Sequence, residues 1–399
     1  MPAVSSSAAG HDRIRSIDAE QGEAVCGGGV SLRHLMEVLL PLGWFVPVVP
    51  GSGAMTVGGA IEADLHGRNH HMDGSFTRHV RSMELLTPDG AVRTLTPEGT
   101  PDLFRATSGG MGLTGVVRSA TVRLLPVETS LVSVDTERAK DLDDLMGRLT
   151  AADHRYRYSV AWIDLLARGT ATGRAVLTRG AHAPLDALPA RSRRAPLAFR
   201  PGRLPARPRF APHGLLGRTA AGRTAVGIFN ELWYRKAPRS RTGELRRIRS
   251  FFHPLDGVPQ WNRIYGRAGF VRYRLVVGYD EDDALRRIIR RVSRRGCPAV
   301  LAVLKRFGTG DPGWLSFPMA GWALTLDIPS NLPGLDEFLD GLGEEVAGAG
   351  GRICVSEDFR LRPELLGAMY PRLAEFRALR AELDPGGVLA PDLARRLGL

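Results

Sequence analysis

Residues 49–90 read VPGSGAMTVGGAIEADLHGRNHHMDGSFTRHVRSMELLTPDG, and this stretch decides the expected fold. Its glycines permit positive φ angles and close backbone approach, so successive amides can surround an anion such as a diphosphate. A second glycine-rich stretch, ATSGGMGLTGVV at 106–117, has the same property. Tight turns between strands are the alternative explanation for both stretches.

Two common nucleotide-binding loops are excluded for these stretches. No strand-turn-helix unit places glycines as GxGxxG, and GxxxxGK[ST] does not occur. A metal site is the other chemistry that this stretch raises, through His66, His70 and His71. Gly67 and Asn69 interrupt that histidine cluster and argue against a regular helix, so we expect no metal ion here.

The positive charge of the chain is local. The 399 residues have a formal net charge of +12, but residues 191–250 alone hold 16 basic and two acidic residues. Nucleic-acid binding would require aromatic side chains among these arginines, and between 191 and 227 only Phe199 and Phe210 occur. We therefore expect no nucleic-acid partner. Residues 183–224 have little periodicity and are long for a loop, so we expect a mobile basic flap there.

Cysteine and hydropathy patterns indicate a reduced protein without a membrane span. Cys26, Cys297 and Cys354 are far apart and odd in number, so we expect buried thiols. No apolar run reaches the roughly 18 residues of a membrane helix, and Met1–Gly10 lacks the features of a signal peptide. We expect a cytoplasmic protein or one peripheral to the plasma membrane. The tryptophans at 162, 233, 261, 314 and 322 are expected in the core.

Hydrophobic periodicity predicts a mixture of strands and helices. The pattern of residue types along the sequence changes after Pro126, so we expect two domains, 1–126 and 127–399. Expected strands cover 13–18, 24–28, 45–49, 81–86, 91–95, 116–125, 156–163, 175–178, 272–277, 299–307 and 322–328, and expected helices cover 32–40, 102–106, 139–152, 282–295 and 335–349.

The two glycine-rich stretches resemble the FAD-binding (PCMH-type) domain of the vanillyl-alcohol-oxidase superfamily. Within it, the chain is most similar to the flavoprotein oxidases that act on decaprenylphosphoryl-β-D-ribose in actinobacterial arabinan synthesis for the cell wall. The resemblance covers about residues 13–399 and includes YSVAWID at 158–164, NELWYRK at 230–236 and LSFPMAGW at 315–322. It implies an α+β fold, with a PCMH-type FAD-binding domain and a substrate domain built on an antiparallel sheet with helices.

The resemblance also implies site residues. The FAD contacts that it implies are Gly51, Thr56, Val57, Gly58 and Gly59 at the diphosphate and ribityl, Asp64, His66, Gly67 and Asn69 at the isoalloxazine, and Val117 at the adenine side. The residues that it implies around the sugar are His66, Trp162, Lys305 and Asp327. The implied reaction moves a hydride from the sugar to N5 of non-covalently bound FAD, which carries the chemistry itself.

The chain departs from the family in two respects. The family's FAD-binding domain opens with a further segment containing a GRGRSYGD-like loop, so we expect the domain at 1–126 to be incomplete. Several pocket positions also differ, and Glu357 stands where the family has a lysine that stabilises negative charge on reduced flavin. The remaining changes are Cys354, Ala323 and Thr325 for Tyr, Asn and Cys, Arg272 and Arg274 for two Gln, and Phe252 for Tyr.

These departures leave two hypotheses open. The first is an FAD-dependent oxidoreductase that oxidises a sugar hydroxyl, with a polyprenyl-phosphate sugar as substrate, a short-chain reductase as partner and contact with a membrane surface. Arg272 and Arg274 lie on one face of a strand and would either pair with Glu357 or bind the substrate phosphate. The second hypothesis is a truncated, non-catalytic homologue with impaired FAD binding.

Overall fold

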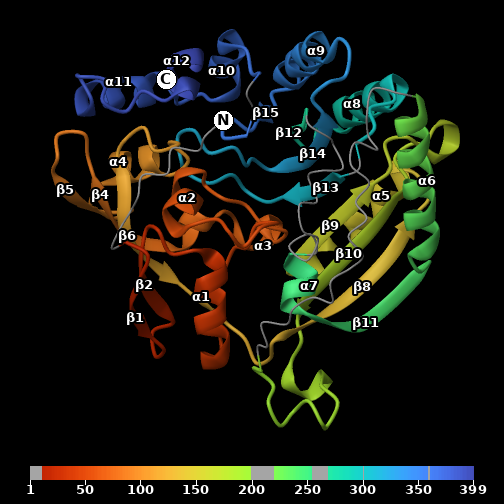
Figure 1. The fold of residues 1–399 in the computed structure, drawn as a ribbon, viewed down its shortest axis with the longest axis horizontal. Coiled ribbons are helices and arrows are strands. Elements are labelled where there is room, and N and C mark those ends of the chain that lie inside the picture. The colour runs from red at the N-terminus through yellow and green to blue at the C-terminus, as the bar shows by residue number, and fades with distance from the viewer. Residues whose placement is uncertain (1–10, 199–219, 254–267, 300, 358–359) are drawn as a thin grey trace.

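The computed structural model describes residues 11–198, 220–253, 268–299, 301–357 and 360–399. Two antiparallel sheets organise the chain, a five-stranded sheet in its first third and an eight-stranded sheet in the remainder (Figure 1). The α+β class expected from the sequence is confirmed. The division near Pro126 stays a prediction, since one apolar core contains Phe45 of the first part together with Tyr158 and Phe252 of the second.

The smaller sheet has the strand order β1-β2-β6-β4-β5, so β6 lies between β2 and β4, and β1 forms one edge. Its strands are β1 (Ile14–Asp18), β2 (Glu23–Gly27), β4 (Val80–Leu86), β5 (Val92–Leu95) and β6 (Val116–Arg123). A separate pair joins β3 (Trp44–Phe45) to β7 (Leu125–Pro126). The expected strand at 45–49 is therefore mostly wrong: Val46–Val49 are buried, but Pro47 and Pro50 break any ladder of backbone N–H donors.

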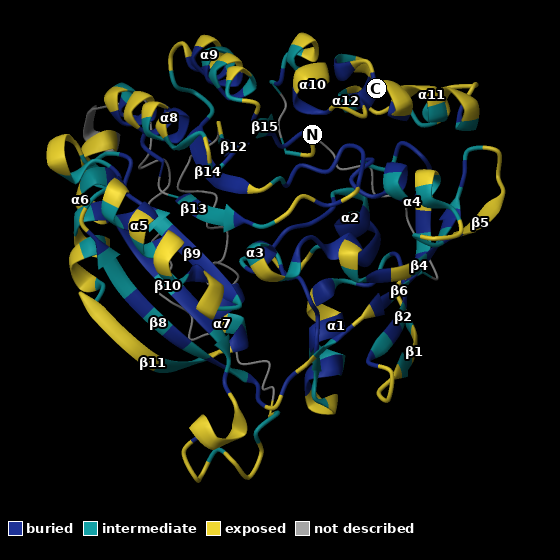
Figure 2. Cartoon of the chain, turned by 180° about the vertical axis from the view of Figure 1, so that it is seen from behind, coloured by how far each residue is buried: buried dark blue, intermediate teal, exposed yellow. Residues whose placement is uncertain are grey.

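The larger sheet has the order β11-β8-β10-β9-β13-β14-β12-β15. Its strands are β8 (Leu131–Ala139), β9 (Tyr158–Ile163), β10 (Ala175–His182), β11 (Ser240–Arg247), β12 (Phe270–Val277), β13 (Ala302–Phe307), β14 (Gly321–Pro329) and β15 (Arg352–Ile353). All nine residues of β14 are buried, because it lies between two neighbours and is covered on both faces. One face packs on helices, and the other turns toward the first part of the chain (Figure 2).

The helices divide between the two parts. In the first part they are α1 (Leu32–Leu39), α2 (Val57–Glu62), α3 (His70–Asp73) and α4 (Pro101–Thr107). In the second they are α5 (Leu142–Ala152), α6 (Ala220–Lys236), α7 (Ile248–Phe252), α8 (Asp282–Arg295), α9 (Leu335–Gly348), α10 (Pro363–Met369), α11 (Leu373–Leu383) and α12 (Asp392–Leu397). Apolar side chains of α5, α8 and α9 form one large core with β12 and β14. Among the described residues no helix combines the length and the apolar character needed to span a bilayer.

The flap expected at 183–224 falls mostly outside the described residues. Residues 199–219 are not described, and the backbone of the last five residues of the predicted flap already belongs to α6. Trp261 also lies outside the described residues. Trp314 and Trp322 are buried as expected, whereas the expectation for Trp233 is wrong, because 46% of its surface is exposed on α6.

Candidate active site

One face of the larger sheet gathers polar and charged side chains from three neighbouring strands. Residues two apart on a strand share a face. In the register of β12 with β14, Arg272 lies opposite Asp327 and Arg274 opposite Thr325, which places these four on the face away from the helices. Alternate residues of the same strands, such as Tyr273, belong to the apolar core.

The next two strands extend this face. On β13, Lys305 lies opposite Ala323 of β14, and Val303 lies opposite Trp162 of β9. The structure therefore brings six of the expected pocket residues onto one continuous surface. Their places in that surface are set by the strand register alone. These residues are Trp162, Arg272, Arg274, Lys305, Ala323 and Thr325, with Asp327 beside them.

Two ion pairs neutralise much of the charge on this face. Arg272 binds Asp327 through both nitrogens of its fork, with Nε–Oδ1 at 2.7 Å and Nη2–Oδ2 at 2.8 Å. The Asp327 side chain is fully buried, and burial raises its pKa although Arg272 acts in the opposite direction. Arg274 lies 2.9 Å from Glu357. The two arginines therefore have separate carboxylate partners, one on the neighbouring strand and one after β15.

Among the described residues, Lys305 has no carboxylate partner on this face. Its Nζ forms no hydrogen bond or ion pair with any described residue. Removal from bulk water, followed by the positive charges of Arg274 and Arg68, lowers the pKa of Lys305 to about 7. A lysine of this kind exists partly as the neutral amine near neutral pH, and a neutral amine can accept a proton.

His66 connects the first part of the chain to this face. Its ring packs against Phe307 and Phe317, with centroids 4.9 Å and 5.5 Å away, and Arg274 Nη1 lies 3.5 Å from its Nε2. Burial lowers the pKa of His66 well below its usual value, and the charges of Arg274 and Lys305 lower it further. His66 is therefore a neutral imidazole, which cannot act as a cationic acid here.

Asp64 fixes the approach of the two parts. Its buried carboxyl accepts hydrogen bonds from the hydroxyls of Thr77 and Ser316, which are 13 and 252 residues away in sequence. Burial, together with the charge of Asp311, raises the pKa of Asp64 to about 7. Its backbone has φ of 38°, a left-handed conformation that is uncommon for a residue other than glycine. Asp64 thus joins the segment after α2 to the segment between β13 and β14. We call this link the clasp.

A second carboxylate, Asp311, completes this clasp and was missed by sequence reasoning. Its Oδ2 accepts hydrogen bonds from Ser75 Oγ at 2.6 Å and Ser75 N at 3.1 Å, and it lies 3.0 Å from His70 Nε2. Its Oδ1 accepts from Arg78 Nε at 2.9 Å. His70 is therefore bound to a carboxylate, and nothing in the sequence spacing signals that residues so far apart meet.

The start of α2 does not offer the free amides that the sequence predicted. Val57 N donates to Val30 O and Gly58 N to Gly28 O, and Thr56 Oγ1 accepts from Gly59 N. The prediction that these amides are free to surround an anion is therefore wrong, because their N–H groups already have partners. Whether Thr56, Val57, Gly58 and Gly59 line the cofactor stays a prediction.

Close packing explains the glycines around α2 better than anion binding does. A Cβ on Gly58 would lie 3.1 Å from Gly28 O, and one on Gly28 would lie 2.0 Å from Val117 O. A Cβ on Gly51 would meet no described residue within 4 Å, unlike one on the other predicted glycines. Val117 therefore packs against Gly28 through its carbonyl group.

Asn69 has an acceptor that no described residue satisfies. Its Nδ2 donates to Pro47 O at 2.8 Å and to Asp73 Oδ2 at 2.6 Å, whereas its buried Oδ1 has no hydrogen-bond partner. A Cβ on Gly67 would lie 2.5 Å from this oxygen, so Gly67 leaves the space that Asn69 occupies.

Phe252 is the one predicted pocket residue that packs elsewhere. It is 1% exposed and lies in the apolar core against Phe45 and Tyr158, with ring centroids 5.4 Å and 4.8 Å away. Cys354 lies near the charged face, buried with Phe307, Phe317 and Ala323. Phe252 thus lies in the apolar core and not on the charged face.

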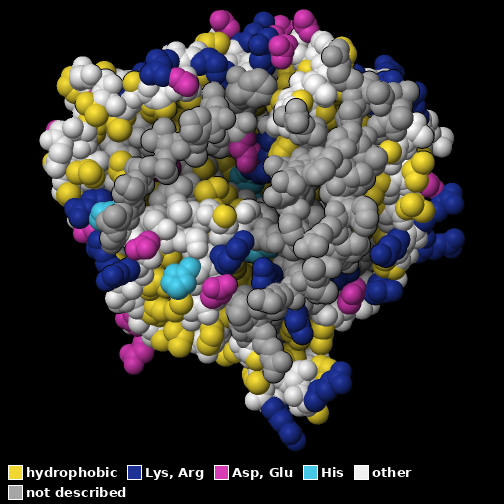
Figure 3. Space-filling view, viewed as in Figure 1, with side chains coloured by type: hydrophobic (Ala, Val, Ile, Leu, Met, Phe, Trp, Pro, Cys, Tyr) yellow, Lys and Arg dark blue, Asp and Glu magenta, His cyan; other side chains and the backbone are white. Residues whose placement is uncertain are grey.

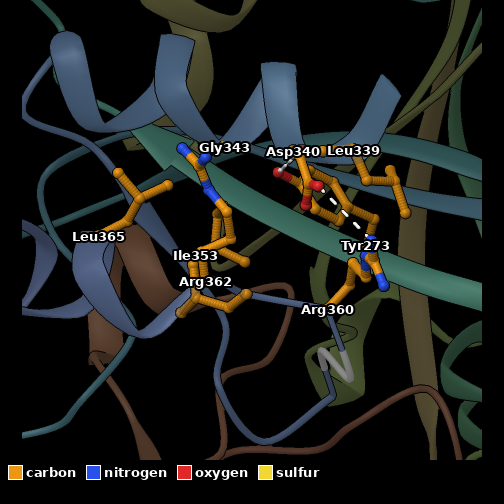
Figure 4. Close-up of a pocket in the computed structure, with 9 residues that line it drawn as sticks. Tyr273, Leu339, Asp340, Gly343, Ile353, Arg360, Arg362 and Leu365 are labelled. Carbon is orange, nitrogen blue, oxygen red and sulfur yellow. Dashed lines mark hydrogen bonds and ion pairs between the residues drawn. The ribbon is translucent and has the colours of Figure 1, made fainter. Parts of the chain in front are cut away.

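A small pocket on the opposite side of the larger sheet is too small for a cofactor. It has a volume of about 10 Å³, which is room for about one water molecule. Figure 4 shows its residues around the side chain of Tyr273, whose hydroxyl donates to Leu339 O at 3.5 Å. The lining residues come from α9, β12, β15, α10 and the segment before α10.

Comparison with known proteins identifies the family. A family model described as an FAD binding domain matches residues 4–96. Decaprenylphosphoryl-β-D-ribose oxidase of Mycolicibacterium smegmatis is 42% identical over 390 residues, which are 97% of this chain and 83% of that protein. The chain belongs to the family of FAD-dependent oxidoreductases that includes this oxidase.

Other relatives of this PCMH-type oxidoreductase are known. A Streptomyces coelicolor protein named "Uncharacterized protein in mprA 5′ region" is 53% identical over 375 residues, 93% of this chain and all of that protein. D-lactate dehydrogenase of Archaeoglobus fulgidus is 30% identical over 115 residues, 28% of this chain and 26% of that protein. The sequence-based identification of an FAD enzyme of the actinobacterial oxidase type is confirmed.

The described residues fit the ring end of FAD better than its diphosphate end. The ring of a flavin carries an N–H donor and carbonyl acceptors, and Asn69 Oδ1 is a buried acceptor without a partner. Lys305 supplies an amine that forms no hydrogen bond or ion pair with a described residue, and His66 supplies a neutral ring packed against Phe307. At the diphosphate end, the amides at the start of α2 are already bonded.

Proposed function

We propose that the chain oxidises a hydroxyl group of a lipid-linked sugar of the decaprenylphosphoryl-ribose kind. One observation carries the proposal: Trp162, Lys305 and Asp327, which the resemblance places around the sugar, share a face of the larger sheet that turns toward His66. The 42% identity to decaprenylphosphoryl-β-D-ribose oxidase supports the substrate class.

Lys305 is the group that we assign to proton transfer. When an alcohol carbon is oxidised, a hydride leaves its C–H bond and a proton leaves its hydroxyl. Bound FAD would supply the hydride acceptor. The neutral amine of Lys305 accepts the hydroxyl proton at Nζ, which its pKa of about 7 permits at neutral pH. After this transfer, the side chain of Lys305 is an ordinary lysine ammonium.

The remaining charges orient the sugar. Arg272 and Asp327 compensate each other, as do Arg274 and Glu357, so these four add little net charge to the pocket. Glu357 replaces the family's lysine, and Arg274 offsets its negative charge at 2.9 Å. We therefore propose that the substrate differs from ribose in the hydroxyls that these paired side chains can contact. Asn69, His66 and Trp162 would hold the ring of the cofactor and of the sugar.

The test uses the purified full chain in two stages. The absorbance spectrum first reports whether FAD is bound. The yellow protein is then mixed anaerobically with decaprenylphosphoryl-ribose and with its arabinose and 2-deoxy analogues, and loss of flavin absorbance is followed. We expect at least one of the sugars that retain the hydroxyl at C2 to bleach the flavin. The 2-deoxy compound, which lacks this hydroxyl, should not bleach it.

The Lys305→Met variant separates binding from chemistry. It should retain the flavin spectrum and lose at least about 100-fold in the rate of bleaching. A yellow wild-type protein that no lipid-linked sugar bleaches would refute the proposed substrate class. A colourless protein would favour the alternative of a non-catalytic homologue. A reductase partner stays a prediction from the family resemblance.

A further inference from the structure

Helix α6 presents four large apolar side chains to solvent. Ile228, Phe229, Leu232 and Trp233 are 57%, 46%, 63% and 46% exposed, and they lie on adjacent turns of one face. The rings of Phe229 and Trp233 stack with centroids 6.1 Å apart. Four large apolar side chains gathered on one exposed helix face are unusual for a soluble surface and mark an interaction site.

The polar contacts of the opposite face fix the rotation of α6. Asn230 is fully buried and donates from Nδ2 to Asp164 Oδ1 at 2.7 Å. One turn away, Tyr234 donates from its hydroxyl to Ala139 O at 3.2 Å. Turning the apolar residues inward would break these buried hydrogen bonds, so the outward direction of the apolar face is built into the fold.

An ion pair between Glu231 and Arg174 also holds α6 against the sheet. Glu231 lies 2.6 Å from Arg174 Nη2, and that arginine also binds Asp164 at 2.7 Å. The guanidinium of Arg174 lies 4.7 Å from the ring centre of Tyr234. The inner face of α6 therefore combines the buried Val226 with polar side chains, whereas its four large apolar side chains at 228, 229, 232 and 233 are exposed.

Basic side chains surround the apolar face at both ends of the helix. At its C-terminal end, Lys236 and Arg239 are exposed and form no ion pair with a described residue. Near its N-terminal end, Arg223 and Arg168 both approach Gly296, at the end of α8. Along the edge that α6 forms in Figure 1, Figure 3 shows hydrophobic and basic side chains next to each other.

The hollow beside α8 extends this basic surface. It has a volume of about 610 Å³ and lies between α5, α8 and the segment after β9. Arg168, Arg290 and Arg294 line it and form no ion pair with any described residue. Arg286 also lines it, but is bonded to Asp143 Oδ1 at 2.9 Å. The hollow thus holds four arginines against two carboxylates, Asp141 and Asp143, and through Arg168 it adds to the positive charge near the N-terminal end of α6.

We propose that the exposed face of α6 (Ile228, Phe229, Leu232 and Trp233) docks the protein onto a membrane that contains anionic lipids. An anionic bilayer supplies both an apolar interior and negative head groups, and Trp and Phe are typical of side chains that enter its interface. A second copy of this chain would bring Lys236 and Arg239 against like charges. The membrane is therefore the occupant that the charges favour. This inference does not depend on the proposed enzymatic activity.

Co-sedimentation of the full chain with vesicles tests the proposal. One set of vesicles contains phosphatidylcholine alone, and the other contains phosphatidylcholine with phosphatidylglycerol. We expect binding to the anionic vesicles, weakened by added salt because the charge contribution is screened. The Leu232→Gln/Trp233→Gln variant should lower the partition coefficient at least about tenfold. Lys236→Gln should lower it about fivefold on anionic vesicles alone.

A matched control uses exposed apolar residues far from α6. Leu42 and Val388 are 51% and 71% exposed on other elements, and Leu42→Gln/Val388→Gln should bind vesicles as the wild type does. Brominated lipid should quench the fluorescence of the wild type more than that of Trp233→Gln. The proposal is overturned if the wild type ignores anionic vesicles, if the α6 variant binds like the control, or if wild-type protein forms a dimer that the α6 variant abolishes.

Discussion

The buried pair of Arg272 and Asp327 allows a quantitative prediction. Replacing Arg272 by Met keeps most of the side-chain volume and removes both hydrogen bonds, at 2.7 Å and 2.8 Å. Asp327 is then a fully buried carboxylate without its partner. Breaking a buried ion pair from one side costs about 3–5 kcal/mol, so we expect the variant to lose that amount of unfolding free energy at pH 8.

The pH dependence of this loss has a defined sign. Burial already raises the pKa of Asp327 above its usual 3.8, and removing Arg272 removes the main opposing contribution. The folded state of the variant therefore binds a proton more readily than the unfolded state does, and protonation favours folding. The loss is fully present above the raised pKa and shrinks as the pH falls through it toward 4.

Urea unfolding at pH 8, 7, 6 and 5 measures the loss, with tryptophan fluorescence and circular dichroism as two probes of one transition. The double variant Arg272→Met/Asp327→Asn is the control, because an amide needs no counter-charge. It should recover all but about 1–2 kcal/mol of the wild-type stability. A loss below about 1 kcal/mol at pH 8, or one that stays constant with pH, refutes the assignment of a buried, compensated pair.

Three further predictions concern single groups. Gly28→Ala places a Cβ 2.0 Å from Val117 O and should destabilise the chain by at least about 3 kcal/mol, whereas Gly51→Ala meets nothing and should change stability by less than about 0.5 kcal/mol; equal effects in urea unfolding would contradict the packing argument. The rate of flavin bleaching should rise with pH through about 7, since the amine of Lys305 accepts a proton only when neutral, and a profile that Lys305→Met leaves unchanged would exclude this role. Burial raises the pKa of Cys354 to about 11, so a thiolate reagent should label it only after unfolding, and rapid labelling of native protein at pH 8 would show that the thiol is accessible.

The elements with strong local signals were predicted well. Helix α8 has the predicted bounds, because Leu285, Ile288 and Val292 recur at helical spacing and Gly296 ends it in the left-handed conformation. Helix α2 was missed because Gly58 and Gly59 have low helix propensity, and tertiary contacts at its start overcome that preference.

Helix α6 was missed for a different reason. Its apolar residues face solvent, so the pattern of a core-facing helix did not apply, and Trp233 was wrongly assigned to the core. The sheet face was partly predictable, since the alternation of Arg272 and Arg274 places both on one side. Their different partners, Asp327 and Glu357, depend on strand order and on a distant turn, which alternation does not specify.

The clasp formed by Asp64 and Asp311 has a consequence for the order of folding. Asp311 contacts Ser75 across 236 residues, and Asp64 contacts Ser316 across 252. Contacts of such long sequence separation form late, because the loop entropy must be overcome before they add stability. During synthesis, the loop around His66 emerges long before Ser316. During synthesis, the carboxyl of Asp64 and the Ser75 hydroxyl therefore lack these partners until residues 311–316 have been made.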